Sequence, residues 1–261
     1  MALFRIDHIP KTAKVNLPLN IILPDPDRMD GVPVRQRKVL YLLHGLSDDA
    51  SAWQRYSSIE MVALEYGLVV VMPSVGRSFY ANLPNGQDYF SYLAEELPQY
   101  LSDVFDLRPA REDTLLAGLS MGGYGAFKLG LNYPERFAAV ASFSGVLSLE
   151  FMRLYPDDRR FSEFTHVFGD FQNLPGSLHD PMTWYQAAAK DPARLPRLFI
   201  SCGQQDDLYP VNLIVSSALR QMGVPFEYYE EENARHTWDF WDREIKRFLA
   251  AVLGPMPVRE G

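Results

Sequence analysis

The sequence predicts an α/β fold in which a mostly parallel central sheet is covered by helices on both faces. Short apolar runs rich in β-branched and aliphatic residues alternate with helical stretches along the chain. These runs are hydrophobic almost throughout, which is typical of strands buried on both faces. No repeat, low-complexity tract or Gly/Ser linker divides the 261 residues. We therefore expect a single domain over residues 1–261.

The first expected strand differs from those that follow. Residues 15–22 alternate in polarity and carry proline, a pattern that suits an antiparallel strand at the edge of a sheet. The central strands are expected at six apolar runs, which are residues 39–43, 68–72, 114–117, 138–143, 198–202 and 226–229.

Helices are expected between these runs, with ends marked by capping residues and glycines. Ser57 or Ser58 can cap a helix that runs to about Glu65 and stops at Gly67. Helical spacing of apolar residues indicates further helices at 89–105, at 208–222 before Gly223, and at 238–253.

One stretch, residues 150–189, breaks this alternation. It is polar, aromatic and rich in loop-forming residues, and it lies between two expected core strands. An excursion of this length in a compact domain is usually functional, although an ordinary surface insertion would have a similar composition. We interpret it as a small cap-like insertion.

Composition excludes several classes of protein. The formal net charge of -8 disfavours nucleic acid and anionic membranes as partners, because both require a basic surface. A single cysteine, Cys202, excludes an internal disulfide and a thiolate zinc site, so we expect no metal and no cofactor. No leader pattern or membrane-spanning run is visible, which favours a cytoplasmic location.

The motif that carries chemistry is G-x-S-x-G at residues 118–122, directly after an apolar strand and before a helical pattern. This context is the one that a nucleophile elbow requires. The serine, Ser120, is held in a strained backbone conformation, and glycines at 118 and 122 let strand and helix approach closely. The backbone N–H of Met121 then faces the position where an acyl oxygen becomes negative.

A serine hydroxyl needs a base and an acid, expected in the chain order Ser, Asp or Glu, His. The base is His236, which follows the last expected strand and precedes the last helix. The acid is Asp206, just past the strand that ends at Cys202, with the adjacent Asp207 as the alternative. Asp206 would hold the imidazole tautomer and stabilise the imidazolium.

The second oxyanion donor is expected in the loop after the strand at 39–43. Gly45 permits a turn that points the N–H of Leu46 inward, toward the N–H of Met121. His44 precedes the serine and is expected to brace this loop. Trp53, in the same connection, suits either a pocket wall or the core.

The segments LLHGLSDDASAW, GLSMGGYGAFKLGLNYPERF and CGQQDDLYPVN, with a His-Thr-Trp before the last helix, resemble the esterase D group of α/β-hydrolases. The likeness covers residues 15–250 and is strongest to the tributyrin-esterase branch. It implies the α/β-hydrolase fold, Ser120, Asp206 and His236 as the triad, and Leu46 and Met121 as oxyanion donors. It also implies assembly into homo-oligomers.

The related S-formylglutathione hydrolases usually carry SMGGHGA at the elbow, where this chain has Tyr124, and they tend to lack the pair seen here as His44-Gly45. These differences favour short-chain carboxylic esters over the glutathione thioester. The function predicted is therefore a serine carboxylesterase acting on a small-molecule ester. Acetylxylan or feruloyl ester hydrolysis, thioester hydrolysis and a non-catalytic binding module are the alternatives.

Aromatic residues are the expected substrate contacts. They are Trp53, Tyr124 and Trp184, with Tyr185 and Phe168 as further candidates for the acyl-pocket wall. Cys202 is expected to be a buried structural thiol.

Overall fold

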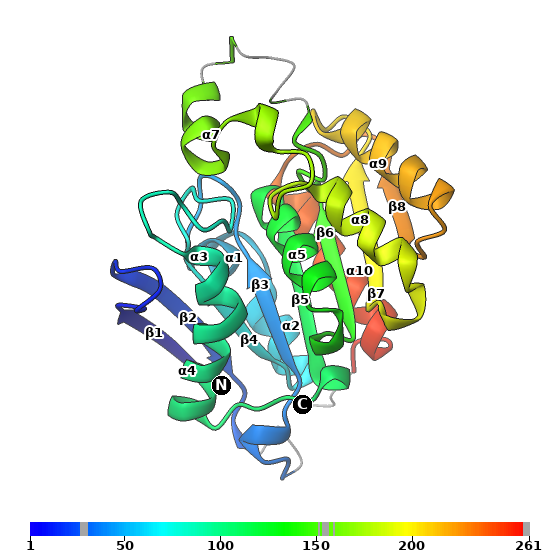
Figure 1. The fold of residues 1–261 in the computed structure, drawn as a ribbon. Helices are drawn as coiled ribbons and strands as arrows, with labels where there is room; N and C mark the ends of the chain where they lie inside the picture. Colours follow the sequence, from blue (N-terminus) through cyan, green and yellow to red (C-terminus); the bar gives the residue numbers. More distant parts are fainter. Residues whose placement is uncertain (27–30, 151, 153–156, 159, 258–261) are drawn as a thin grey trace.

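A computed structural model describes residues 1–26, 31–150, 152, 157, 158 and 160–257. Its centre is an eight-stranded sheet in the order β1-β2-β4-β3-β5-β6-β7-β8 (Figure 1). The strands are β1 Ala2–His8, β2 Leu17–Leu23, β3 Val39–Leu43, β4 Val69–Pro73, β5 Thr114–Leu119, β6 Ala139–Phe143, β7 Arg197–Gly203 and β8 Glu227–Glu231.

The six strands from β3 to β8 are parallel, which confirms the predicted sheet. Strand β2 is antiparallel to β4, as expected, but it is not at the edge, because β1 pairs with its other side over residues 2–8. Strand β1 was not predicted. Its residues are all exposed or half-buried, so it lacks the continuous apolar pattern of a central strand.

Helices cover both faces of the sheet (Figure 1). One face packs against α1, α2 and α10, and the other against α4, α5, α8 and α9. No helix in the described ranges is long and apolar enough to cross a membrane. The helices are α1 Ala52–Tyr56, α2 Ile59–Tyr66, α3 Tyr89–Ser91, α4 Leu97–Phe105, α5 Met121–Asn132, α7 Phe161–Phe168, α8 Pro181–Lys190, α9 Tyr209–Gln221 and α10 Trp238–Leu253.

The helix expected at 89–105 contains a wider turn. A π-helical segment, Tyr92–Glu96, joins α3 to α4. Pro98 then lies in the first turn of α4, where a missing backbone N–H is tolerated.

The excursion at 150–189 divides into two parts. Helix α7 lies over the carboxyl ends of the strands, whereas α8 packs alongside α5 (Figure 1). The aromatic side chains of α8, Trp184 and Tyr185, are buried in the same core as α5. Only the part that includes α7 therefore covers the end of the sheet, and α8 belongs to the helical layer of the core.

Candidate active site

Ser120 occupies a sharp turn between β5 and α5, where its backbone has φ 52° and ψ −117°. A residue with a side chain rarely adopts this conformation, so the turn stores strain. The flanking glycines explain why the turn can form. A Cβ on Gly118 would lie 2.2 Å from the carbonyl oxygen of Gly122, and a Cβ on Gly122 would lie 2.5 Å from that of Leu43. Strand and helix therefore meet at a separation that only glycine permits.

Three side chains from distant parts of the chain form one hydrogen-bonded line. Ser120 Oγ lies 3.0 Å from His236 Nε2, and His236 Nδ1 lies 2.8 Å from Asp206 Oδ2. With an ionised Asp206, Nδ1 carries the proton and Nε2 is free to accept one from the serine. The three residues that the sequence singled out are thus brought together, in the geometry of a nucleophile, a base and an orienting acid.

Asp206 is buried at the end of β7, and its side chain has no exposed surface. Burial alone would raise the pKa of this carboxyl, but the hydrogen bond from His236 and the one that Oδ1 accepts from the Leu208 N–H at 2.8 Å outweigh it. The pKa of Asp206 is therefore lowered, and the carboxylate stays charged beside the imidazole. The alternative acid, Asp207, is exposed and has no hydrogen bond to His236 in the described structure.

The two expected oxyanion donors, Leu46 and Met121, both lie beside Ser120 in one pocket. Met121 is the first residue of α5, so its N–H has no partner within the helix. Among the described residues, the N–H of Leu46 has no hydrogen-bond acceptor either. Both groups are therefore free to bind a developing oxyanion.

His44 holds the peptide unit that carries the Leu46 N–H. Its Nε2 accepts a hydrogen bond from the Val75 N–H at 3.1 Å, so its Nδ1 carries the proton and donates to the Gly45 carbonyl at 2.7 Å. The Gly45 carbonyl and the Leu46 N–H belong to the same peptide plane and point in opposite directions. Burial lowers the pKa of His44 to about 4, so the ring is neutral at neutral pH. The structure thus gives the expected bracing role of His44 a specific geometry.

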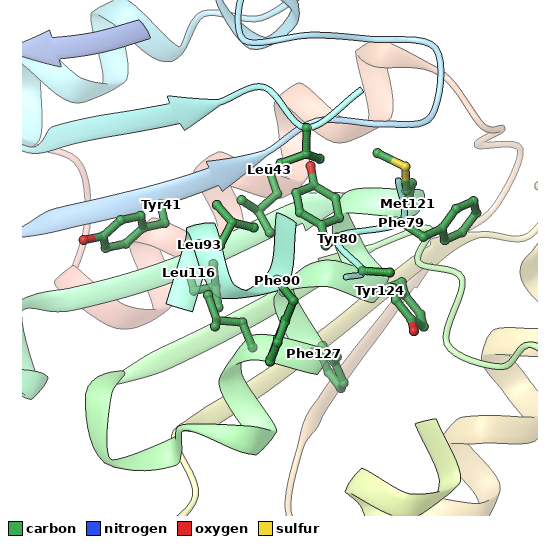
Figure 2. Packing of buried hydrophobic residues seen from close by; sticks show 14 of the residues in the cluster. Tyr41, Leu43, Phe79, Tyr80, Phe90, Leu93, Leu116, Met121, Tyr124 and Phe127 are labelled. Atoms are coloured by element: carbon green, nitrogen blue, oxygen red, sulfur yellow. The ribbon is translucent and has the colours of Figure 1, made fainter. Parts of the chain in front are cut away.

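A second layer of buried polar contacts supports this loop. The Tyr80 hydroxyl donates to the His44 carbonyl at 2.9 Å. Figure 2 shows the Tyr80 ring among the buried side chains of the core. A Cβ on Gly125 of α5 would come within 2.4 Å of this ring. Lys128 Nζ donates in turn to the Tyr80 carbonyl at 3.2 Å. Lys128 is fully buried, and burial lowers its pKa to about 7. Sequence reasoning did not identify this lysine, because a single Lys in a helix usually lies in solvent.

A pocket of about 610 Å³ opens above Ser120. Most of its wall is apolar, and the exposed carboxylate and guanidinium groups in it belong to Glu150, Arg160 and Asp207. Arg160 is held by Asp158 through two contacts of 3.0 and 2.9 Å. The apolar wall consists of Leu46, Phe79, Met121, Val146, Met152, Phe164, Leu208, Val211 and Ile214.

The aromatic residues expected to contact substrate lie in the core instead. Trp53 lies on α1 and is buried against Trp238 of α10, and its indole N–H donates to the Leu43 carbonyl at 3.0 Å. Tyr124 is fully buried, with its hydroxyl on the His179 carbonyl at 2.8 Å. Trp184 packs against Tyr124 and donates to the Leu178 carbonyl at 3.0 Å. Each ring thus satisfies its polar atom inside the protein, and none of the three lines the pocket.

The two further candidates follow the same pattern. Tyr185 is buried and donates to the Leu147 carbonyl at 2.8 Å. Phe168 packs among Phe79, Tyr124 and Phe171. The aromatic wall of the pocket comes from Phe79 and Phe164, which the sequence did not distinguish from other phenylalanines.

Cys202 and two further histidines lie outside the triad. Cys202 is buried, and burial raises the pKa of its thiol, so it is an unreactive structural residue, as predicted. His166 lies on α7 and His179 in the loop before α8. Within the described residues, no group of three or more His, Cys, Asp or Glu side chains could hold a metal ion.

Comparisons with known proteins agree with this geometry. The model of the Esterase family, described as "Putative esterase", matches residues 11–252. An acetyl esterase from Caldicellulosiruptor saccharolyticus is 31% identical over 94% of this chain and 96% of its own length.

Two solved structures from Staphylococcus aureus are each 33% identical, and each comparison covers 97% of this chain and 98% of the other. One is the fluorophosphonate-binding serine hydrolase FphF in a substrate-bound form, with a TM-score of 0.86, and the other is an S-formylglutathione hydrolase (FrmB) with a TM-score of 0.84. The chain therefore belongs to the Esterase family of α/β-hydrolases and is an enzyme that acts on esters.

Proposed function

We propose that this enzyme is a serine carboxylesterase that hydrolyses short-chain acyl esters through an acyl-enzyme intermediate. The observation that carries this proposal is the hydrogen-bonded line from Ser120 through His236 to Asp206 at the floor of a largely apolar pocket. A hydroxyl in this arrangement loses its proton to the imidazole as it attacks a carbonyl carbon.

The reaction follows from the positions of the donors and acceptors. Ser120 Oγ attacks the ester carbonyl while His236 Nε2 takes its proton. The carbonyl oxygen becomes negative and is bound by the N–H groups of Leu46 and Met121. The imidazolium, stabilised by Asp206, gives the proton to the leaving alcohol. Water activated by the same histidine then cleaves the acyl-enzyme and regenerates Ser120.

The pocket supports a short, uncharged acyl group as the substrate. Aliphatic and aromatic side chains, among them Met152, Phe164 and Val146, line most of it, so methylene groups gain by burial there. A neutral ester also needs no counter-charge, and the exposed charged residues of the pocket are of mixed sign. The likeness to an acetyl esterase supports the same size class.

The test has two parts. Purified enzyme should hydrolyse p-nitrophenyl acetate and butyrate faster than decanoate, and Ser120→Ala should remove both this activity and the labelling by a fluorophosphonate probe. Ser148→Ala is the matched control and should keep the labelling. Ser148 lines the same pocket, but in the described structure its hydroxyl accepts from the Glu150 N–H at 3.2 Å and makes no hydrogen bond to the triad. Hydrolysis by Ser120→Ala at the wild-type rate would contradict the mechanism.

Thioester hydrolysis is a second candidate, because one of the similar solved structures is an S-formylglutathione hydrolase. The replacement of histidine by Tyr124 at the elbow carries no argument against it, since Tyr124 lies in the core and not in the pocket. Comparing kcat/KM for S-formylglutathione with that for p-nitrophenyl acetate separates the two activities. Acetylated xylan and methyl ferulate, tested beside them, cover the carbohydrate-ester alternative.

We also propose that the enzyme forms a homo-oligomer. This proposal rests on the resemblance to the esterase D group, whose members often assemble. Light scattering on the purified enzyme tests it.

A further inference from the structure

Strand β1 forms one edge of the sheet, and this edge is not protected from pairing with another strand. Strand β1 lies at one end of the sheet order and pairs only with β2 (Figure 1). Its seven residues, ALFRIDH, are regular and contain neither proline nor glycine. Within the described ranges, no backbone group of β1 bonds to anything outside the sheet. An edge of this kind is a template for pairing with another strand.

The opposite edge of the sheet is protected in a way that β1 is not. Three of the five residues of β8 are glutamates, two of them paired with Arg197 and Arg243, and charged side chains of this kind protect an edge strand from pairing. Large apolar side chains are exposed along and beside β1 instead. They are Met1, Leu3, Phe4 and Ile9, the last with 71% of its surface exposed.

We propose that β1 pairs antiparallel with β1 of a second copy of this chain, with Arg5 of each copy opposite Asp7 of the other. Arg5 and Asp7 share one face of the strand and are both exposed, and neither forms an ion pair within the described chain. Opposite charges that face each other across a strand pair stabilise it. The partner that this edge fits is thus an identical strand.

The charges also select the register. In a symmetric antiparallel pair, residues opposite each other lie on the same face of the sheet. The two strands can therefore shift past each other only by two residues at a time. Centring the pair on Arg5 sets Arg5 against itself, and centring it on Asp7 sets Asp7 against itself. Centring it on Ile6 instead forms two Arg5–Asp7 contacts and sets Phe4 opposite His8. Of these three registers, only the last joins the copies without like charges face to face.

The consequence is a dimer with one continuous sheet across both copies. No residue of β1 lines the pocket that contains Ser120. Ester hydrolysis is therefore expected to persist in a monomer. The proposal rests on the homo-oligomer proposed above, for which it names the interface, and it is independent of the proposed esterase activity.

Sedimentation velocity over a range of concentrations tests the proposal. The wild type should sediment with twice the monomer mass. Arg5→Asp turns two attractive contacts into two repulsive ones and should weaken the dimer about tenfold or more. The charge swap Arg5→Asp with Asp7→Arg restores both contacts and should restore the dimer. A monomeric wild type, a dimer unaffected by Arg5→Asp, or a swap that stays monomeric would each overturn it.

Cysteine cross-linking tests the register. Arg5→Cys and Asp7→Cys chains, mixed and treated with a short bis-methanethiosulfonate reagent, should form a covalent dimer faster than either chain alone, because positions 5 and 7 face each other. The native Cys202 is buried and gives little background. Equal cross-linking by the separate chains would refute this register. Hydrolysis of p-nitrophenyl acetate by every variant checks that each has folded.

Discussion

His44 is the residue whose replacement tests the oxyanion loop most directly. Within the described structure it forms no hydrogen bond to the triad, yet its two ring nitrogens bond to the Gly45 carbonyl and to the Val75 N–H. His44→Ala removes both contacts and frees the peptide plane that carries the Leu46 N–H. We expect the serine and its base to stay in place while one of the two oxyanion donors loses its orientation.

The size of the effect follows from these contacts. Loss of one oxyanion donor lowers kcat by about 10²–10³, which is roughly 2.7–4 kcal/mol of transition-state stabilisation. The fall in kcat should be nearer 10² than 10³, because the Gly45 carbonyl still accepts a hydrogen bond from the Asp48 N–H at 3.2 Å. The orphaned Val75 N–H should also lower the free energy of unfolding by about 1–3 kcal/mol. KM should change little, because His44 does not line the pocket.

Two conservative variants separate the two nitrogens. An Asn side chain can place a donor near the position of Nδ1, so His44→Asn should recover much of kcat. A Gln side chain reaches toward the position of Nε2, so His44→Gln should recover stability more than kcat. Steady-state hydrolysis of p-nitrophenyl acetate and urea unfolding measure the two effects. Full activity in His44→Ala, or rescue of kcat by Gln alone, would refute the assignment.

Three further predictions concern the surroundings of the site. Burial lowers the pKa of Lys128 from 10.5 to about 7. At pH values between these two, the lysine is protonated in the unfolded chain and neutral in the folded one, so the free energy of unfolding rises with pH. At 1.36 kcal/mol per pH unit, the free energy of unfolding should rise by about 2 kcal/mol between pH 7 and pH 9. Urea unfolding of Lys128→Met should lack that rise. Gly122→Ala should reduce stability by about 1–3 kcal/mol in thermal unfolding, and activity with it, because its Cβ would meet the Leu43 carbonyl oxygen at 2.5 Å. Arg77 binds Glu163 of α7 and the Leu46 carbonyl at 3.4 Å. Arg77→Met should lower kcat/KM by about fivefold at most, because the pair is exposed, and the charge swap Arg77→Glu with Glu163→Arg should recover the part due to Glu163.

The sequence was sufficient for the parallel sheet because those strands are buried on both faces. Five of the six strands in that region are fully buried or nearly so, and they appear as continuous apolar runs. The first strand could not be found in this way, since its side chains alternate between a half-buried face and solvent. Missing β1 also led to the wrong position for β2, which was expected at the edge and is covered on that side.

The three residues of the candidate triad were easier to predict than the residues that line the pocket. Ser120, Asp206 and His236 lie at the ends of strands or in the loops beyond them, and their order in the chain restricts the choice. A pocket wall has no such signal, because an aromatic ring in a loop-rich segment can pack into either the core or the pocket. Trp184 illustrates this, since its place on α8 directs it to α5 and away from Ser120.

Buried polar contacts through Lys128 link the insertion at 150–189 to the loop that carries Leu46. Its ammonium group lies 3.2 Å from both the Tyr80 carbonyl and His179 Nδ1. On one side Tyr80 reaches the His44 carbonyl, and on the other Tyr124 holds the His179 carbonyl from the same helix as Lys128. The loop that leads into α8 and the loop that carries Leu46 are thus fixed to one helix, α5, whose first residues include the second oxyanion donor. A change at His179 is therefore expected to reach both loops.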